Sequence, residues 1–170
     1  YPKGNEIYGL YQAREHILRL GSCILVEGNA DVVSMHEAGF NNTVAPLGTG
    51  FTFAQACVLR RFTDQITLLF DGDGAGRHAN EVALQHLLPL RIVPQIVLLP
   101  EGDGPDSFAR RLSHDEAQRF ITDNAINLVQ FYFITKLNEQ LNNPIRTAQV
   151  AREIVQKIAL IPNDITRAAL

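Results

Sequence analysis

Residues 66–89 read ITLLFDGDGAGRHANEVALQHLLP, and this stretch decides the fold. It begins with a short run, residues 66–70, that is apolar apart from Thr67 and predicts a buried strand. Apolar residues at helical spacing follow from Gly74 to Leu88, and Pro89 ends the helical pattern. A buried strand that leads through an acidic turn into a helix predicts one unit of a parallel α/β sheet.

The same alternation continues on both sides of this stretch. Further buried strands are predicted over residues 23–27, 43–47 and 95–99. Helices are predicted over residues 9–20, 29–38 and 52–62. Right-handed crossovers place helices on both faces of such a sheet. We therefore predict an α/β fold with a parallel four-stranded sheet flanked by helices.

The pattern changes after Pro100, where a capping box from Ser113 to Glu116 predicts a short helix. From Ala125 onward two helices are predicted, separated by an Asn-rich break at residues 141–144, and a third is cut off by the end of the chain. We therefore expect three parts, namely a leading segment (1–20), the α/β domain (21–124) and a partial helical subdomain (125–170).

The composition fits one globular domain, with or without a small appendage. A hydrophobic fraction of 46% with 19% charged residues excludes a disordered or collagen-like chain. No apolar run approaches ~18 residues, so no membrane is expected among the partners. The only methionine is Met35, so we expect a piece of a longer protein. Cys23 and Cys57 lack metal-ligand spacing, which favours a reducing, cytoplasmic compartment.

Acidic residues follow three of the predicted strands. Seven of the 18 acids stand there: Glu27, Asp31, Asp71, Asp73, Glu101, Asp103 and Asp106. The net charge of −3 argues against a nucleic-acid-binding protein. Acids gathered at one edge of a sheet, however, would form a pit that needs cations. Oxygen ligands without His or Cys favour Mg²⁺ or Mn²⁺ over Zn²⁺, and such ions usually serve phosphates.

Simpler interpretations stay open for each motif. Asp71 and Asp73 can form a capped turn without a metal. A calcium-binding loop does not fit, because Ala75 stands at its third ligand position and Val82 at its twelfth. Residues 47–50 (LGTG) are too short for a dinucleotide-binding fingerprint. The five histidines share no spacing, and we expect them at helix surfaces or in packing. The coincidence of three acidic loops at one edge favours the metal site.

The loops at residues 27–31 (EGNAD) and 71–77 (DGDGAGR) resemble those of a Toprim domain, a fold shared by primases, topoisomerases and some nucleases. Stretches around them resemble the bacterial replicative primases of the DnaG type, namely residues 7–13 (IYGLYQA), 99–107 (LPEGDGPDS) and 161–167 (IPNDITR). This resemblance covers nearly the whole chain. It implies a Toprim-type sheet followed by a helical subdomain.

The resemblance also implies roles for individual residues. The catalytic residues and principal metal ligands would be Glu27, Asp71 and Asp73. Asp31 and Asp106 would be supporting acids of the same pocket. Lys3 would lie beside the path of the nucleotide and the template, and Arg77, just after the two aspartates, is a candidate for contacting phosphates of the nucleotide or the template.

Two positions depart from the family's pattern. Asn29 stands where the first acidic loop often has an aromatic residue. Gly104 stands where the third acidic loop often has an Asp, and Asp103, one residue earlier, is a candidate replacement. A second metal ion is therefore implied less firmly than the first.

By resemblance, the function is that of a DNA primase catalytic core, a nucleotidyltransferase. It would make short RNA primers from ribonucleoside triphosphates on a single-stranded DNA template, at the replication fork in the bacterial cytoplasm. The replicative helicase would bind a region outside this chain, and the isolated chain is expected to be inactive or weakly active. The alternatives are a Toprim topoisomerase or nuclease, or a non-catalytic Toprim module that binds DNA. None of the four tyrosines has a context that marks a topoisomerase nucleophile.

Overall fold

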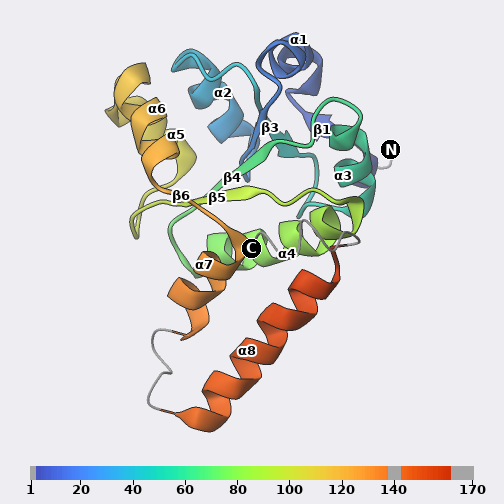
Figure 1. Ribbon diagram of the computed structural model, residues 1–170. Coiled ribbons are helices and arrows are strands. Elements are labelled where there is room, and N and C mark those ends of the chain that lie inside the picture. Colours follow the sequence, from blue (N-terminus) through green and yellow to red (C-terminus); the bar gives the residue numbers. More distant parts are fainter. Residues whose placement is uncertain (1–2, 138–142, 162–170) are drawn as a thin grey trace.

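A six-stranded mixed sheet forms the centre of the molecule (Figure 1). The computed structural model describes residues 3–137 and 143–161, apart from the side chains of Lys3 and Leu137. The strands lie in the order β1-β3-β2-β4-β5-β6. Their bounds are β1 (Ile7–Tyr8), β2 (Cys23–Leu25), β3 (Thr43–Pro46), β4 (Ile66–Phe70), β5 (Gln95–Leu98) and β6 (Ala125–Ile126). The four central strands, β3, β2, β4 and β5, are parallel and are the four that the apolar runs predicted.

The predicted count of four strands is too low. Strand β1 pairs antiparallel with β3, and β6 pairs antiparallel with β5, so a short strand closes each edge. Strands of two residues carry no periodic signal that a sequence pattern could reveal. The helix predicted to start at Ala125 is also wrong there, because Ala125 and Ile126 form β6. Asn127 then caps a later helix, α7 (Leu128–Tyr132).

Helices cover both faces of the sheet, as predicted. One face carries α1 (Leu10–Leu20), α3 (Phe53–Arg60), α4 (Gly74–Leu87) and α7. The other face carries α2 (Asn29–Glu37), α5 (Pro105–Arg111) and α6 (His114–Asp123). Helix α5 was not predicted from the sequence, because Gly and Pro residues dominate the segment that leads into it. Two short 3₁₀ helices, η1 (Lys3–Asn5) and η2 (Leu88–Leu90), complete this part of the chain.

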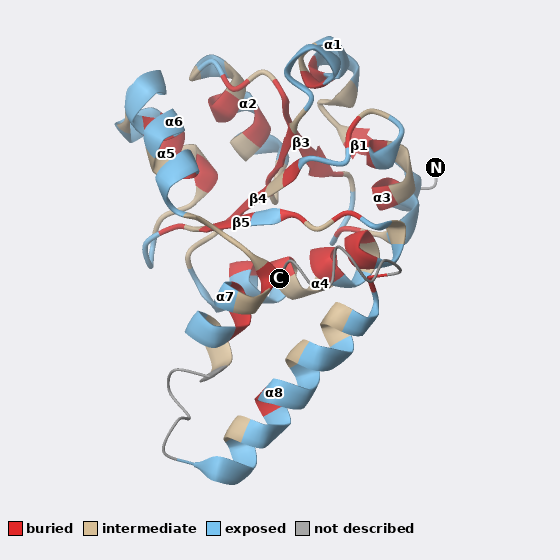
Figure 2. Cartoon of the chain, in the orientation of Figure 1, coloured by how far each residue is buried: buried red, intermediate tan, exposed pale blue. Residues whose placement is uncertain are grey.

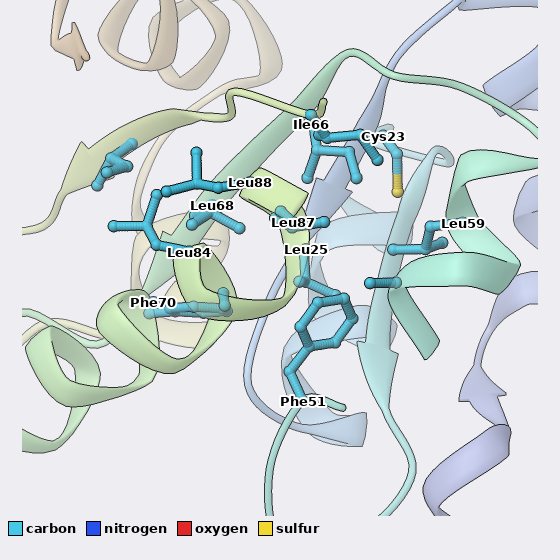
Figure 3. Packing of buried hydrophobic residues seen from close by; sticks show 14 of the residues in the cluster. Cys23, Leu25, Phe51, Leu59, Ile66, Leu68, Phe70, Leu84, Leu87 and Leu88 are labelled. Carbon is cyan, nitrogen blue, oxygen red and sulfur yellow. The ribbon is translucent and has the colours of Figure 1, made fainter. Parts of the chain in front are cut away.

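Successive residues of each central strand face opposite layers of the core. Leu68 of β4 belongs to the cluster under α1, α3 and α4, whereas Leu69 belongs to the cluster under α2, α5 and α6. Figure 3 shows part of the first cluster, with Leu68 of the sheet beside Leu84 of α4 and Leu25 beside Phe51. Strands buried on both faces explain why the apolar runs are continuous. This double core fixes the strand ends from which the acidic loops start.

Helix α8 (Pro144–Ala159) extends away from the sheet and is largely exposed (Figure 2). A π-helical turn, η3 (Phe133–Leu137), connects to α7 and carries Lys136. The Lys136 ammonium lies 3.0 Å from a Glu81 carboxylate oxygen and 3.2 Å from one of Glu153, so it joins α4 to α8. The third predicted helix falls in residues 162–170, outside the described residues. None of the described helices has the length and apolar character needed to cross a bilayer.

Candidate metal centre

The acidic loops follow the carboxyl ends of three adjacent parallel strands. Glu27 follows β2, Asp71 directly follows β4, and the loop at residues 99–104 follows β5. Because β2, β4 and β5 are parallel neighbours in the sheet, the three loops lie together at the carboxyl-terminal ends of these strands. The parallel pairing therefore brings the sequence-predicted acids to one end of the domain.

Main-chain hydrogen bonds join these loops. The Asp71 amide donates to Glu27 Oε1 at 3.1 Å, which holds the side chain of the first loop against the backbone of the second. The Gly72 amide donates to the Asp103 carbonyl oxygen at 2.9 Å, which joins the second loop to the third. The three loops therefore form one connected unit.

Glycines in the second loop allow the close approach of backbone segments. A Cβ atom on Gly72 would overlap the carbonyl oxygen of Pro100, and one on Gly76 would overlap the carbonyl oxygen of Asp71. Neither position has a positive φ, so the requirement is for space rather than for an unusual backbone conformation. Glycine at positions 72 and 76 is therefore a packing requirement of the loop.

Asp73 has a structural role as well as a place in the candidate centre. Its Oδ1 accepts a hydrogen bond from the Gly76 amide at 2.9 Å, and so Asp73 is the N-cap of α4. This is the capped turn that the sequence left open as an alternative. The cap occupies one carboxylate oxygen, and the second accepts no hydrogen bond from the described residues.

Glu27 and Asp71 carry negative charge that their surroundings disfavour. Burial raises the pKa of Glu27, and the nearby charges of Asp71, Asp31 and Asp73 raise it further, against the lowering effect of the Asp71 amide. Burial also raises the pKa of Asp71, with a second contribution from Asp73. The Asp71 carboxylate accepts no hydrogen bond from the described residues. These two carboxylates therefore need a cation when both are ionised.

Asp31 and Asp106 form a separate hydrogen-bonded pair beside these acids. Asp31 Oδ2 accepts from the Gly28 amide at 2.9 Å, and its Oδ1 accepts from the Asp106 amide at 3.2 Å. Asp106 Oδ1 accepts from the Ser34 hydroxyl and from Arg110 Nε, which lies 2.8 Å away. These two partners hold the pKa of Asp106 below its usual value. Burial nevertheless raises the pKa of Asp31, against the effect of its two amide donors.

Asp103 is turned toward helix α5. Its two carboxylate oxygens face the Arg111 guanidinium, at 3.1 Å from Nη1 and 2.6 Å from Nη2. Such a two-point ion pair has the planar geometry that an Arg side chain favours. Both oxygens of Asp103 are therefore engaged by the helix that follows its own loop.

The structure describes the side chain of Arg77 but not that of Lys3, the other basic residue of the predicted site. Arg77 is exposed, donates from Nη1 to the Gly72 carbonyl oxygen at 3.4 Å, and lines a cavity of about 440 Å³ together with Asp71. Lys3 lies in η1, but its side chain is outside the described residues. Arg77 therefore stands beside the second acidic loop, and among the described residues only its Nη1 has a partner, so most of its donors can serve another group.

Sequence reasoning missed a second set of residues beside Glu27. A cavity of about 610 Å³ is lined on one side by the loop at residues 48–52 and on the other by Ala75, His78 and Ala79 of α4, with Phe70 at the end of β4. The spacing of the histidines could not predict this cavity, because His78 and the loop at residues 48–52 are distant in sequence and come together only in the folded chain. The LGTG run was the available signal, since a glycine-rich loop after a strand leaves main-chain groups open to a ligand.

The donor chemistry of the centre fits a hard divalent cation. All of its candidate ligands are carboxylate oxygens, which Mg²⁺ and Mn²⁺ prefer. Within residues 3–137 and 143–161, however, no group of three or more His, Cys, Asp or Glu side chains is already arranged around one point. Occupation by an ion therefore requires the carboxylates to turn toward it.

Comparison with known proteins gives one family match and several close structural relatives. Residues 21–97 match the model of the Toprim domain family. A DNA primase from Aquifex aeolicus is 41% identical over 124 residues, which are 73% of this chain and 25% of that protein. The chain thus spans about a quarter of the length of this curated relative.

Two solved structures superpose over almost all of the chain. A DNA primase domain from Pseudomonas aeruginosa gives a TM-score of 0.87 at 33% identity, over 99% of this chain and 54% of that one. A DnaG primase catalytic domain bound to single-stranded DNA gives a TM-score of 0.86 at 29% identity, over 99% of this chain and 56% of that one. The α/β sheet and the helices that follow it are therefore an arrangement also found in solved primase domains.

Proposed function

Because the chain contains a Toprim domain, we propose that it forms part of the catalytic core of a bacterial DNA primase of the DnaG type. In this reaction the 3′-hydroxyl of a growing RNA primer attacks the α-phosphate of a ribonucleoside triphosphate paired with a single-stranded DNA template. A new phosphodiester bond forms, and pyrophosphate leaves. Similarity to primase domains along 99% of the chain supports this function over a topoisomerase or nuclease.

The observation that carries the proposal is the uncompensated negative charge of Glu27 and Asp71 at adjoining strand ends. The Asp71 amide joins the two residues, and burial raises the pKa of both carboxyl groups. Glu27, Asp71 and Asp73 would hold Mg²⁺ or Mn²⁺ as the catalytic, metal-binding acids. When bound, the ion would neutralise charge on the triphosphate.

Other residues of the centre would position the ligands of the ion and the nucleotide. Asp31 and Asp106 would act as supporting acids, because their hydrogen bonds join α2 to α5 behind the acidic loops. Arg77 would donate to a phosphate, since it is exposed beside Asp71. Lys3 would lie beside the path of the nucleotide or the template. The 610 Å³ cavity beside Glu27 is large enough for a nucleotide, within the range of ~300–1,000 Å³ typical of small-molecule sites.

In this proposal the chain has three parts and acts with partners outside it. Residues 1–20 lead into a Toprim domain at 21–124, and residues 125–170 begin a helical subdomain. The template, the primer and the replicative helicase would be bound largely by other regions, in the bacterial cytoplasm. The isolated chain, with only 15 Lys and Arg residues and a net charge of −3, would make little or no primer.

A paired assay tests this function. The natural polypeptide that contains this chain is given single-stranded DNA with ribonucleoside triphosphates and Mg²⁺, and in parallel supercoiled or linear DNA. We expect short RNA products and no cleaved or relaxed DNA. Asp71→Asn should abolish the RNA products, whereas Asp123→Asn, an equal charge change at the end of α6, should not. DNA cleavage or relaxation without primer synthesis would overturn the proposal.

A further inference from the structure

The cavity of about 440 Å³ beside the second acidic loop has one wall from the helices that follow the sheet. Besides Asp71 and the end of β5, its lining includes Ile134 and Thr135 of η3. The larger cavity, of about 610 Å³, lies beside Glu27 instead. Because the Asp71 amide donates to Glu27 Oε1, the two cavities adjoin the same pair of acids. The candidate metal centre therefore stands between two cavities.

The two cavities differ in their chemistry. The larger one has Phe51 and Phe70 in its lining, and none of its described lining residues is an arginine or a lysine. Such a mostly apolar lining suits a nucleoside. The smaller one has Arg77 in its lining, together with Asp71 and Glu101. Of the two, only the smaller cavity therefore offers a permanent positive charge to a phosphate group.

Arg77, Asp71 and Glu101 share the smaller cavity without pairing with one another. Within the described part of the chain, Arg77 makes a single long hydrogen bond, of 3.4 Å, to a main-chain carbonyl oxygen, and neither carboxylate has a hydrogen bond or an ion pair. Asp103 and Asp106 differ, because each pairs with an arginine of α5. A ligand that carries both a divalent cation and phosphate groups would satisfy the two acids and the arginine together.

Lys136 holds the η3 wall of this cavity against α4. Its ammonium lies 3.0 Å from a carboxylate oxygen of Glu81 in α4 and 3.2 Å from one of Glu153 in α8. The π-helical form of η3 is rare and is frequent at functional sites. The Thr135 hydroxyl donates to the Phe131 carbonyl oxygen at 2.7 Å, so toward a ligand it can only accept, for example from water bound to a metal ion. The wall is thus tied to the helix that begins at the second acidic loop.

We propose that the smaller cavity binds the diphosphate group of a Mg²⁺-bound nucleotide, and the pyrophosphate that this group becomes, between Arg77 and the η3 wall. Asp71 and Glu101 would face the ion, Arg77 would donate to the phosphate oxygens, and Ile134 would bound the cavity on the side of η3. The nucleoside would lie in the larger cavity, on the other side of the centre. This inference rests on the proposed function for the identity of the nucleotide, but binding of pyrophosphate can be measured without template, primer or catalysis.

Charge placed at Ile134 tests the η3 wall. This side chain is 48% exposed, so Ile134→Glu and Ile134→Lys should both fold. Inorganic pyrophosphate with Mg²⁺ is titrated calorimetrically into the natural polypeptide that contains this chain, without nucleotide or DNA. Because a carboxylate repels the diphosphate and an ammonium attracts it, we expect Kd at low salt to rise about threefold or more with Glu and to fall similarly with Lys. The same two changes at Ile145, which is exposed on α8 outside the lining, should leave Kd unchanged.

Arg77→Gln tests the phosphate contact. We expect the Kd for pyrophosphate with Mg²⁺ to rise by about tenfold or more, and Arg77→Lys to recover part of this loss. Arg61→Gln, an equal charge change at the exposed end of α3, should keep the wild-type Kd. An unchanged Kd in Arg77→Gln, or a Kd that does not move in opposite directions in the two Ile134 variants, would overturn the inference. A wild-type polypeptide that binds no pyrophosphate with Mg²⁺ would overturn it as well.

Two nucleotides identify which phosphates occupy the cavity. ATP with Mg²⁺ should depend on Arg77 and on the charge at position 134 as pyrophosphate does, whereas AMP, which has no diphosphate group, should not. An equal dependence for AMP would place the α-phosphate in the cavity and overturn the assignment. If the natural polypeptide makes no primer but pyrophosphate binding responds as expected, the proposed function fails and the diphosphate site stands. Primer synthesis with an unresponsive pyrophosphate Kd would leave the function intact and overturn the site.

Discussion

The main-chain amide of Asp71 donates a hydrogen bond to Glu27 Oε1 over 3.1 Å, across the ends of two neighbouring parallel strands. The bond is formed between a side chain of one acidic loop and the backbone of the next. It fixes Glu27 close to the Asp71 carboxyl group, whose charge contributes to the raised pKa of Glu27. The hydrogen bond itself favours ionised Glu27, but it holds Glu27 near the Asp71 carboxylate, whose charge repels it.

Burial of the Glu27 carboxylate, together with repulsion by the nearby acids, predicts that metal-free stability increases when Glu27 is neutralised. Glu27→Gln keeps an oxygen that can accept from the Asp71 amide but removes one negative charge. Because the pKa of Glu27 is raised in the folded state, that state binds the proton more tightly than the unfolded chain does. Stability of the wild-type protein therefore falls as pH rises through the raised pKa. At pH 7 without metal, we expect a higher Tm for Glu27→Gln than for wild type.

The pH dependence distinguishes this explanation from a general effect of the substitution. The advantage of Glu27→Gln should shrink as pH is lowered from neutrality through the raised pKa toward 4.5, where wild-type Glu27 is protonated. Glu116→Gln is the control of opposite sign, since hydrogen bonds from Ser113 lower the pKa of Glu116. That variant should lose stability at pH 7 and recover relative to wild type in acid. Thermal unfolding from pH 4 to 8 measures both, and a Tm gain independent of pH would contradict the repulsion.

Gly76→Ala should destabilise the second acidic loop by steric overlap. The new Cβ atom would meet the carbonyl oxygen of Asp71, which is backbone and cannot rotate away. We expect a loss of about 1–3 kcal/mol in the free energy of unfolding, the usual cost of overpacking. Gly74→Ala, two residues earlier and with open space, should change it by less than ~0.5 kcal/mol. Urea unfolding of both variants measures the difference, and equal losses would contradict the close approach at Gly76.

The sequence was sufficient for the central sheet because each of its strands is buried on both faces. A short, mostly apolar run between two helical patterns, such as residues 66–70, is typical of a buried strand of a parallel sheet. The edge strands β1 and β6 could not be predicted, since two residues have no period and their pairing depends on a distant partner. Helix α5 was hidden for a related reason, because Pro105 looks like a loop signal until its place at the first helical position is known.

The candidate site was predictable to the level of the strand ends but not to that of the side chains. Parallel strands place Glu27 and Asp71 at one edge whatever their neighbours are. Which acids are paired depends on contacts that the fold makes: Ser34 of α2 engages the distant Asp106, and Arg111 of α5 turns back to engage Asp103. Only three-dimensional contacts separate these neutralised acids from the uncompensated pair. The cavity that η3 closes beside Asp71 has the same origin.

A bound ion should appear between the first two acidic loops. In crystals soaked with Mn²⁺, we expect an anomalous peak within ~2.5 Å of at least two carboxylates among Glu27, Asp71 and Asp73. The uncompensated charge of Glu27 and Asp71 is the physical reason. Asp106 should have no peak of its own, because Arg110 and Ser34 already satisfy it. A peak confined to Asp103 or Asp106, or no peak at saturating Mn²⁺, would refute this location.

Asp73→Asn separates the capping role of Asp73 from its role as a charge. An Asn side chain accepts the hydrogen bond from the Gly76 amide as well as Asp does, so the start of α4 should survive with a loss of at most ~1 kcal/mol. The substitution also removes a charge that raises the pKa values of Glu27 and Asp71. Metal-free stability should therefore be unchanged or slightly higher.

The metal role should not survive the same substitution, because one formal negative charge leaves the surroundings of the ion. We expect Mg²⁺-dependent primer synthesis by the natural polypeptide to fall by about 10²-fold or more, equivalent to ~2.7 kcal/mol of transition-state stabilisation. Asp73→Ala then serves as the contrast, since it removes both the cap and the charge and should lower stability as well as activity. Activity of Asp73→Asn within a few-fold of wild type would leave Asp73 with the capping role alone. A large drop in its metal-free stability would show that the turn needs the charge itself.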